Sequence, residues 1–154
     1  MFKFPQSCRT AKRIALLVYT VIMLLLLFKR TPGSDAGAYW DQLTRQINLS
    51  PFHTINAFLR SFLHGGLTQK RLAIVNLVGN VIMFVPLGFF VPCIWQKTRK
   101  FGWHVLAMAL VIVVIELLQL FTLLGSCDVD DLLLNLVGTT IGFVFWKLCN
   151  RLKK

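Results

Sequence analysis

The sequence predicts an all-α integral membrane protein with about four transmembrane helices, and three observations support that fold class. Hydrophobic residues make up 56% of the 154 residues and charged residues only 15%, a composition typical of membrane proteins. The hydrophobic residues are gathered in long blocks and do not alternate with polar ones. Four blocks reach the roughly 20 residues that a helix needs to cross a hydrocarbon core about 30 Å thick.

The four predicted spans belong to one membrane domain that covers residues 1–154. They are expected at residues 11–28, 72–95, 103–124 and 131–149. The first block could also be a signal peptide, because Ala36-Gly37-Ala38 resembles a cleavage site. We favour a span, since about ten residues separate the block from that site and a signal peptide is cleaved closer to its apolar region.

Glycine and proline distinguish the later spans from one another. Pro86 and Pro92 predict a kink in the second span, whereas the third contains neither residue type and should be straight. In the fourth span, Gly138 and Gly142 form a GxxxG pattern, which predicts close contact with a neighbouring helix.

The first loop is expected to contain an amphipathic helix at about residues 54–64. Thr54 can cap its start and Gly65-Gly66 can end it. Tyr39 and Trp40 upstream are candidate interfacial anchors. A helix that packs over the bundle and a functional lid both fit, and we favour the first. Five residues form the apolar face of this helix: Ile55, Phe58, Leu59, Phe62 and Leu63.

Charge predicts how the chain sits in the membrane. A net charge of +11 would indicate a nucleic-acid partner in a soluble protein, but here the basic residues cluster at the ends of the spans. Four lie before or at the very start of the first span, three lie in residues 96–102, none in 125–130, and four lie from Lys147 onward. The positive-inside rule therefore predicts a multi-pass protein of the cell membrane with both termini in the cytoplasm. The six basic residues of the loop at 29–71 argue mildly against this orientation.

Polar residues inside the spans are the candidate functional residues. A carboxylate at the bilayer centre costs roughly 2.5–3.5 kcal/mol, so Glu116 needs a partner or a solvated site. At about 1.5 Å per residue, the polar residues of three spans fall within about 12 Å of the outer surface. They are expected to line a cavity that opens outward. The candidate site residues are Asn76, Asn80, Glu116, Gln119, Asp128, Asp131 and Asn135.

Several interpretations of this set stay open. Asp128 and Asp130 could instead cap the fourth helix, and the buried amides could form a hydrogen-bond network that only holds the bundle together. The oxygen-rich set suits a divalent cation or a proton relay, although we expect no cofactor and no transition metal. The sequence contains no recognisable Ser-His-Asp or Cys-His arrangement.

Four stretches of the sequence resemble motifs of the VanZ family of bacterial membrane proteins. They are NLSPFHTI at 48–55, NLVGNVIMFVPLG at 76–88, ELLQ at 116–119 and DVDDLLLNLVG at 128–138, with Gly142 following. In one respect the chain departs from the family, because Ser126 and Cys127 stand where an Arg and an aromatic residue usually precede the first Asp. Recognition of a phosphate through that Arg is therefore not expected here.

The resemblance implies a plasma-membrane protein associated with resistance to teicoplanin and related glycopeptides or lipoglycopeptides. We expect a non-enzymatic factor whose outward polar site engages an envelope lipid, a lipid-linked cell-wall precursor or the antibiotic itself. The alternatives are an intramembrane enzyme that uses Glu116 or Asp131 as general acid or base, and a small transporter. The expected partners are membrane lipids, and no nucleic acid is expected.

Overall fold

The computed structural model describes residues 6–28 and 38–152, and side chains from residue 10 onward within them. Four helices in this part of the chain are long and apolar enough to cross a membrane, which confirms the all-α multi-pass fold class. The segment that holds Ala36 and Gly37 lies outside the described residues. The helices are α1 (Gln6–Leu27), α2 (Tyr39–Arg45), α3 (His53–His64), α4 (Leu67–Ile94), α5 (Phe101–Phe121) and α6 (Val129–Arg151).

The helix boundaries differ from the predicted ones where local hydrogen bonds start or stop a helix. Helix α4 begins at Leu67, five residues before the predicted span, because the Gly66 N–H donates to Gln69 Oε1 at 2.8 Å and caps the first turn. It then continues through both prolines. Helix α5 ends at Phe121 because Leu123 adopts a positive φ of 55°, and the chain turns away.

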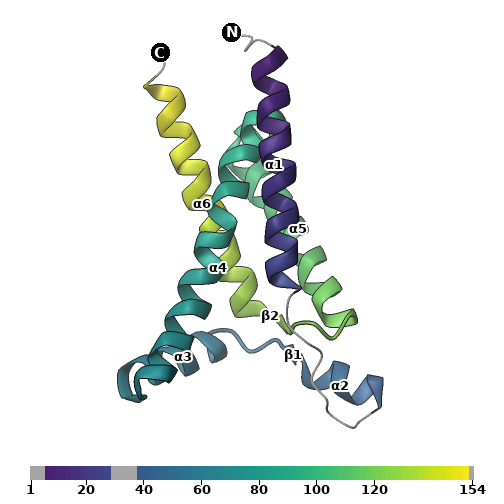
Figure 1. Cartoon of the computed structure of the whole chain (residues 1–154), viewed down its shortest axis with the longest axis vertical. Helices are drawn as coiled ribbons and strands as arrows, with labels where there is room; N and C mark the ends of the chain where they lie inside the picture. Colours follow the sequence, from purple (N-terminus) through teal and green to yellow (C-terminus); the bar gives the residue numbers. More distant parts are fainter. Residues whose placement is uncertain (1–5, 29–37, 153–154) are drawn as a thin grey trace.

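The two ends of the bundle are formed by different segments of the chain (Figure 1). Helix α1 begins and α6 ends at one of them, which we call the terminal end; the 3₁₀ turn η1 (Lys97–Arg99) between α4 and α5 belongs to the same end. Helices α2 and α3 lie at the opposite, loop end. There β1 (Ile47–Asn48) pairs in parallel with β2 (Cys127–Asp128), which joins the first loop to the segment before α6. Helix α2 was not predicted.

Glycines bring α4 and α6 into close contact, as the GxxxG pattern predicted. A Cβ on Gly138 would overlap the carbonyl of Val81, and one on Gly142 would overlap the carbonyl of Val85. Gly88 of α4 makes the reciprocal approach to the Thr139 carbonyl. Backbone therefore meets backbone along the middle of the bundle, and α4 and α6 form its tightest helix pair.

The other helices pack around this pair and leave one seam open. Helix α1 packs on α4 and α5 packs on α6, while α1 and α5 touch little. An apolar groove of about 400 Å³ lies along that seam. The buried side chains of α1, α4 and α5 form one hydrophobic core: Leu16, Met23, Phe84, Leu87, Val91, Met108, Ile112 and Ile115.

Candidate functional site

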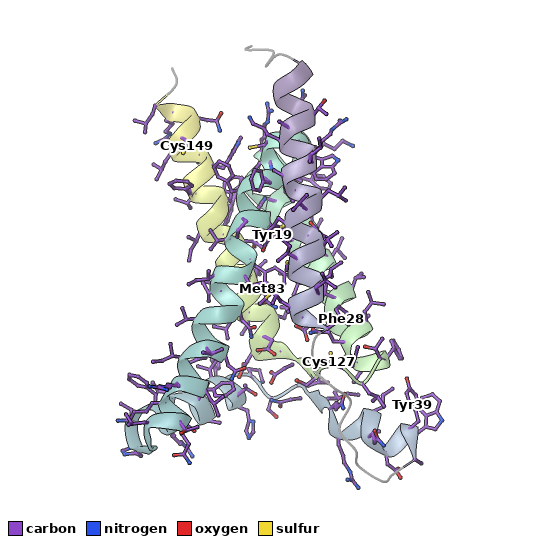
Figure 2. The ribbon with its side chains drawn as sticks, in the orientation of Figure 1. Tyr19, Phe28, Tyr39, Met83, Cys127 and Cys149 are labelled. Atoms are coloured by element: carbon purple, nitrogen blue, oxygen red, sulfur yellow. The ribbon has the colours of Figure 1, made fainter. Side chains whose placement is uncertain are left out.

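A pocket of about 330 Å³ with both polar and apolar lining residues lies at the loop end, between the last turn of α1, the half of α4 nearer the loop end, the end of α5 and the start of α6. Figure 2 labels one of its lining residues, Met83, and also Phe28, which follows the last turn of α1. Four of the predicted site residues line this pocket: Asn76, Asn80, Gln119 and Asp131. The structure thus brings together amides and a carboxylate from three helices. The expectation that Glu116, Asp128 and Asn135 also line the cavity is wrong for this pocket, whose lining does not include them.

The closest polar contact of the pocket joins α4 to α6. Asn80 Nδ2 donates to Asp131 Oδ1 at 2.6 Å. Asp131 stands in the first turn of α6, where the unpaired amides and the dipole of the helix favour a negative charge. One oxygen of this carboxylate is therefore held by Asn80, and the group borders the pocket.

The two other amides of the pocket bind backbone carbonyls. Asn76 is exposed, and its Nδ2 donates to the Leu72 carbonyl of its own helix at 2.8 Å. Gln119 Nε2 donates to the Leu27 carbonyl at 3.2 Å, which connects α5 to the last turn of α1. In each of these two hydrogen bonds the side-chain nitrogen is the donor, so the side-chain oxygen remains available as an acceptor.

Glu116 lies behind the pocket and does not line it. Its side chain is only 4% exposed, and its Oε2 accepts a long 3.5 Å hydrogen bond from the Asp128 N–H. The Asp131 and Asp128 carboxylates are close enough to interact electrostatically with the Glu116 carboxylate. The carboxylates of Glu116, Asp128 and Asp131 therefore lie near one another, and none of the described residues that line the neighbouring pocket is basic.

Asp128 fastens the first loop to the start of α6. Its Oδ1 accepts the Asp130 N–H at 2.8 Å, so it is the N-cap of α6, one of the two roles considered for it. Its Oδ2 accepts from the Thr54 hydroxyl at 2.5 Å and from Asn48 Nδ2 at 3.2 Å. The same carboxylate thus binds two separate segments of the chain.

Asp130 caps a helix that is distant from it in sequence. Its side chain is fully buried and accepts from the backbone N–H of Phe52 at 2.6 Å and of Ile55 at 3.0 Å. These are the first amides of α3, so the expectation that Thr54 caps this helix is wrong. The Thr54 hydroxyl binds Asp128 instead. We call Asn48, Thr54, Asp128 and Asp130 the acidic latch, since they hold α3 to α6.

Asn135 lies one turn after Asp131 on α6 and is 3% exposed. Its Oδ1 finds no hydrogen-bond donor among the described residues. A buried amide oxygen without a donor is uncommon and costs stability. In a hydrogen-bond network that only holds the bundle together, this oxygen would be expected to have a donor.

The arrangement limits the chemistry at this end. Among residues 6–28 and 38–152, no three His, Cys, Asp or Glu side chains come together as a metal-binding group, so a divalent cation at the carboxylates stays a prediction. Among the described lining residues, none is a histidine, and Ser126 supplies the one hydroxyl side chain. The polar groups are therefore suited to hydrogen bonding with a ligand.

Sequence reasoning missed the roles of Asn48, Thr54 and Asp130, and it did not place Ser126 in the pocket. The signal was present in the NLSPFHTI stretch, which carried the family resemblance but had no assigned role. Its polar side chains and first helical amides are the partners of the acidic residues at 128 and 130.

Comparison with known proteins identifies one family. The family model described as VanZ/LLP1 matches residues 15–150, which include all four membrane helices in most of their length. No curated protein and no solved structure matches the chain.

Proposed function

This chain belongs to the VanZ/LLP1 family. From that membership we propose that it is a membrane protein that confers resistance to glycopeptide or lipoglycopeptide antibiotics such as teicoplanin. The loop-end pocket faces outward and binds an amphiphilic ligand. The ligand is an envelope lipid, a lipid-linked wall precursor or the lipid-bearing part of the antibiotic. The observation that carries the proposal is the lining of the pocket, which is polar and apolar at once.

The pocket offers two kinds of surface to an amphiphile. Asn80, Gln119 and Asp131 supply polar atoms, whereas Leu26, Leu27, Val75 and Met83 supply apolar ones. Binding sites for small molecules commonly combine an apolar wall with a few convergent polar groups. An amphiphile that enters from the membrane can therefore bury its chain and hydrogen-bond its head in the same place.

The charges favour hydroxyl, amide or ammonium groups as the polar part of the ligand. Among the described residues that line the pocket, Asp131 is the one charged group, so a bare phosphate would be repelled by its carboxylate. Ser126 and Cys127, which replace the usual Arg and aromatic residue, agree with this preference.

The experiment is deletion of the gene and complementation with variants, with teicoplanin susceptibility as the readout. Asp131→Asn removes the charge at nearly constant size. A lost charge-assisted hydrogen bond is worth about 1.5–3 kcal/mol, or about tenfold or more in binding, so susceptibility should approach that of the deletion. Asp41→Asn, an exposed carboxylate of α2, is the matched control and should complement fully.

Two outcomes would contradict the proposal. Unchanged teicoplanin susceptibility on deletion would remove the resistance role. Full complementation by Asp131→Asn, at equal protein level in the membrane, would remove the pocket from that role.

The lipids and wall precursors of the same strains distinguish a binding factor from an intramembrane enzyme. A binding factor leaves their covalent structures identical in wild-type and deletion cells. A covalent difference that Asp131→Asn abolishes would instead assign the acidic groups to acid–base chemistry.

A further inference from the structure

The described segments at the terminal end of the bundle carry basic side chains and no acidic ones. Three described segments meet there: the start of α1, the turn between α4 and α5, and the last turns of α6. None of the six acidic residues of the sequence falls in these segments. Eight basic residues do: Arg9, Lys12, Arg13, Lys97, Arg99, Lys100, Lys147 and Arg151.

Three adjoining hollows at this end connect the charges to an apolar surface. The first, of about 50 Å³, lies between Lys12 and Arg99, and the second, of about 30 Å³, lies between Lys12 and Arg13. The third, of about 410 Å³, runs from Arg13 along α1 to Leu16 and Leu17. Lys12 borders the first two hollows and Arg13 the last two, so the three hollows adjoin, and we call this row of hollows the groove.

The side chains divide this groove into a head region and a tail region. Arg99 Nε donates to the Pro92 carbonyl at 3.1 Å, which fixes the guanidinium at the end of α4 and leaves its terminal nitrogens for another acceptor. Arg13 lies one turn before Leu16 and Leu17 on α1. Trp95 also lines the tail region and marks the level of the membrane interface, where tryptophan is favoured.

We propose that this groove binds one anionic phospholipid of the inner leaflet. The phosphate lies against Arg13, Arg99 and Lys12, and one acyl chain follows Leu16, Leu17 and Trp95. Guanidinium groups bind phosphate oxygens in pairs of hydrogen bonds, and basic pockets between membrane helices on the cytoplasmic side are suited to acidic lipid heads. This site is separate from the loop-end pocket and has the opposite charge.

The test is a lipid titration of the purified full-length chain in detergent, with bound lipid counted by native mass spectrometry. Phosphatidylglycerol should bind about tenfold more tightly than phosphatidylcholine with the same acyl chains. The double variant Arg13→Gln/Arg99→Gln should lose about tenfold in affinity for phosphatidylglycerol. Lys147→Gln/Arg151→Gln removes the same charge at the same end but outside the groove, and should change affinity by less than about twofold.

Two further arms identify the ligand. Glycerol phosphate and inorganic phosphate carry the head chemistry without a chain, so they should compete only weakly; competition equal to that of the lipid would overturn the role of the acyl groove. Equal loss of affinity in both double variants would show a diffuse surface charge and would also overturn the site. A thermal unfolding curve matching the wild type confirms that a variant which loses the lipid is folded.

Discussion

The Asp130 carboxylate caps α3 from 75 residues away in sequence. It is fully buried and accepts two backbone N–H groups that would otherwise lack partners in the first turn of α3. A helix N-terminus and a carboxylate attract each other, so this contact both satisfies the amides and orients α3. The position of α3 over the loop end therefore depends on a residue of another helix.

Asp130→Ala should destabilise the protein because it removes the carboxylate that two backbone amides at the start of α3 use as their acceptor. We expect a loss of about 1–3 kcal/mol in the free energy of unfolding. The measurement is thermal or denaturant unfolding in detergent, with Asp41→Ala as the control, since Asp41 is exposed in the first turn of α2. Equal stability of the two variants would contradict the capping role.

Cys127 directly precedes Asp128 of the acidic latch, so the pKa of its thiol depends on the carboxylates around it. Burial, together with the nearby Glu116 and Asp128 carboxylates, raises the pKa of the Cys127 thiol above its ordinary value. A raised pKa means less thiolate at a given pH, and the thiolate is the reactive form.

Maleimide labelling should therefore begin at higher pH for Cys127 than for an exposed thiol. The comparison uses a chain with Cys127 as its sole cysteine and a cysteine-free chain carrying Ser50→Cys at an exposed position. The rate–pH profile of Cys127 should be displaced upward relative to that of Ser50→Cys. Coincident profiles would contradict a half-buried thiol near carboxylates.

The Asn80–Asp131 pair could be predicted from the sequence, whereas the Asp130 cap could not. Asn80 and Asp131 lie in helices whose phase and depth follow from periodicity and span length, so their meeting was foreseeable. Asp130 binds backbone amides of an irregular segment, and no periodic pattern indicates which distant loop a carboxylate will reach. The same reason explains why Thr54 was misassigned as the cap of α3.

At the scale of elements, the contact between α4 and α6 determines the shape of the bundle. Gly138 and Gly142 pack directly on the Val81 and Val85 carbonyls, and this contact was predicted from the GxxxG pattern. The start of α4 was predicted less well, because its cap depends on the Gln69 side chain and not on hydropathy. Helix α2 is short and has little apolar periodicity, so it was missed.

Gly142→Ala should weaken the bundle, because its new methyl group would overlap the Val85 carbonyl. Overpacking of this kind costs about 1–3 kcal/mol. Gly79→Ala is the matched control within α4, since a Cβ there meets nothing within 4 Å. It should be neutral or stabilising by up to about 1 kcal/mol, from helix propensity. Unfolding in detergent measures both, and an unchanged midpoint for Gly142→Ala would contradict the close contact.

For the whole molecule, fold class, number of spans and family were accessible from the sequence because they depend on block length, composition and motif order. The loop end contains both acidic and basic residues, whereas the described segments of the terminal end contain basic residues and no acidic ones, and this difference follows from the sequence as well. The open seam between α1 and α5 could not be predicted from the sequence, because it depends on which helix pairs pack tightly. The function proposed for the pocket rests on the loop end facing outward.

A single thiol in the pocket tests that central claim most directly. In a chain whose four cysteines are replaced by serine, Ser126→Cys lines the pocket, and Lys97→Cys lies in the turn at the terminal end. Intact cells are treated with a membrane-impermeant maleimide. If the loop end faces outward, Ser126→Cys reacts in intact cells and Lys97→Cys reacts only after the membrane is opened; this is the result that we expect. Labelling of Lys97→Cys in intact cells, with Ser126→Cys protected, would contradict it.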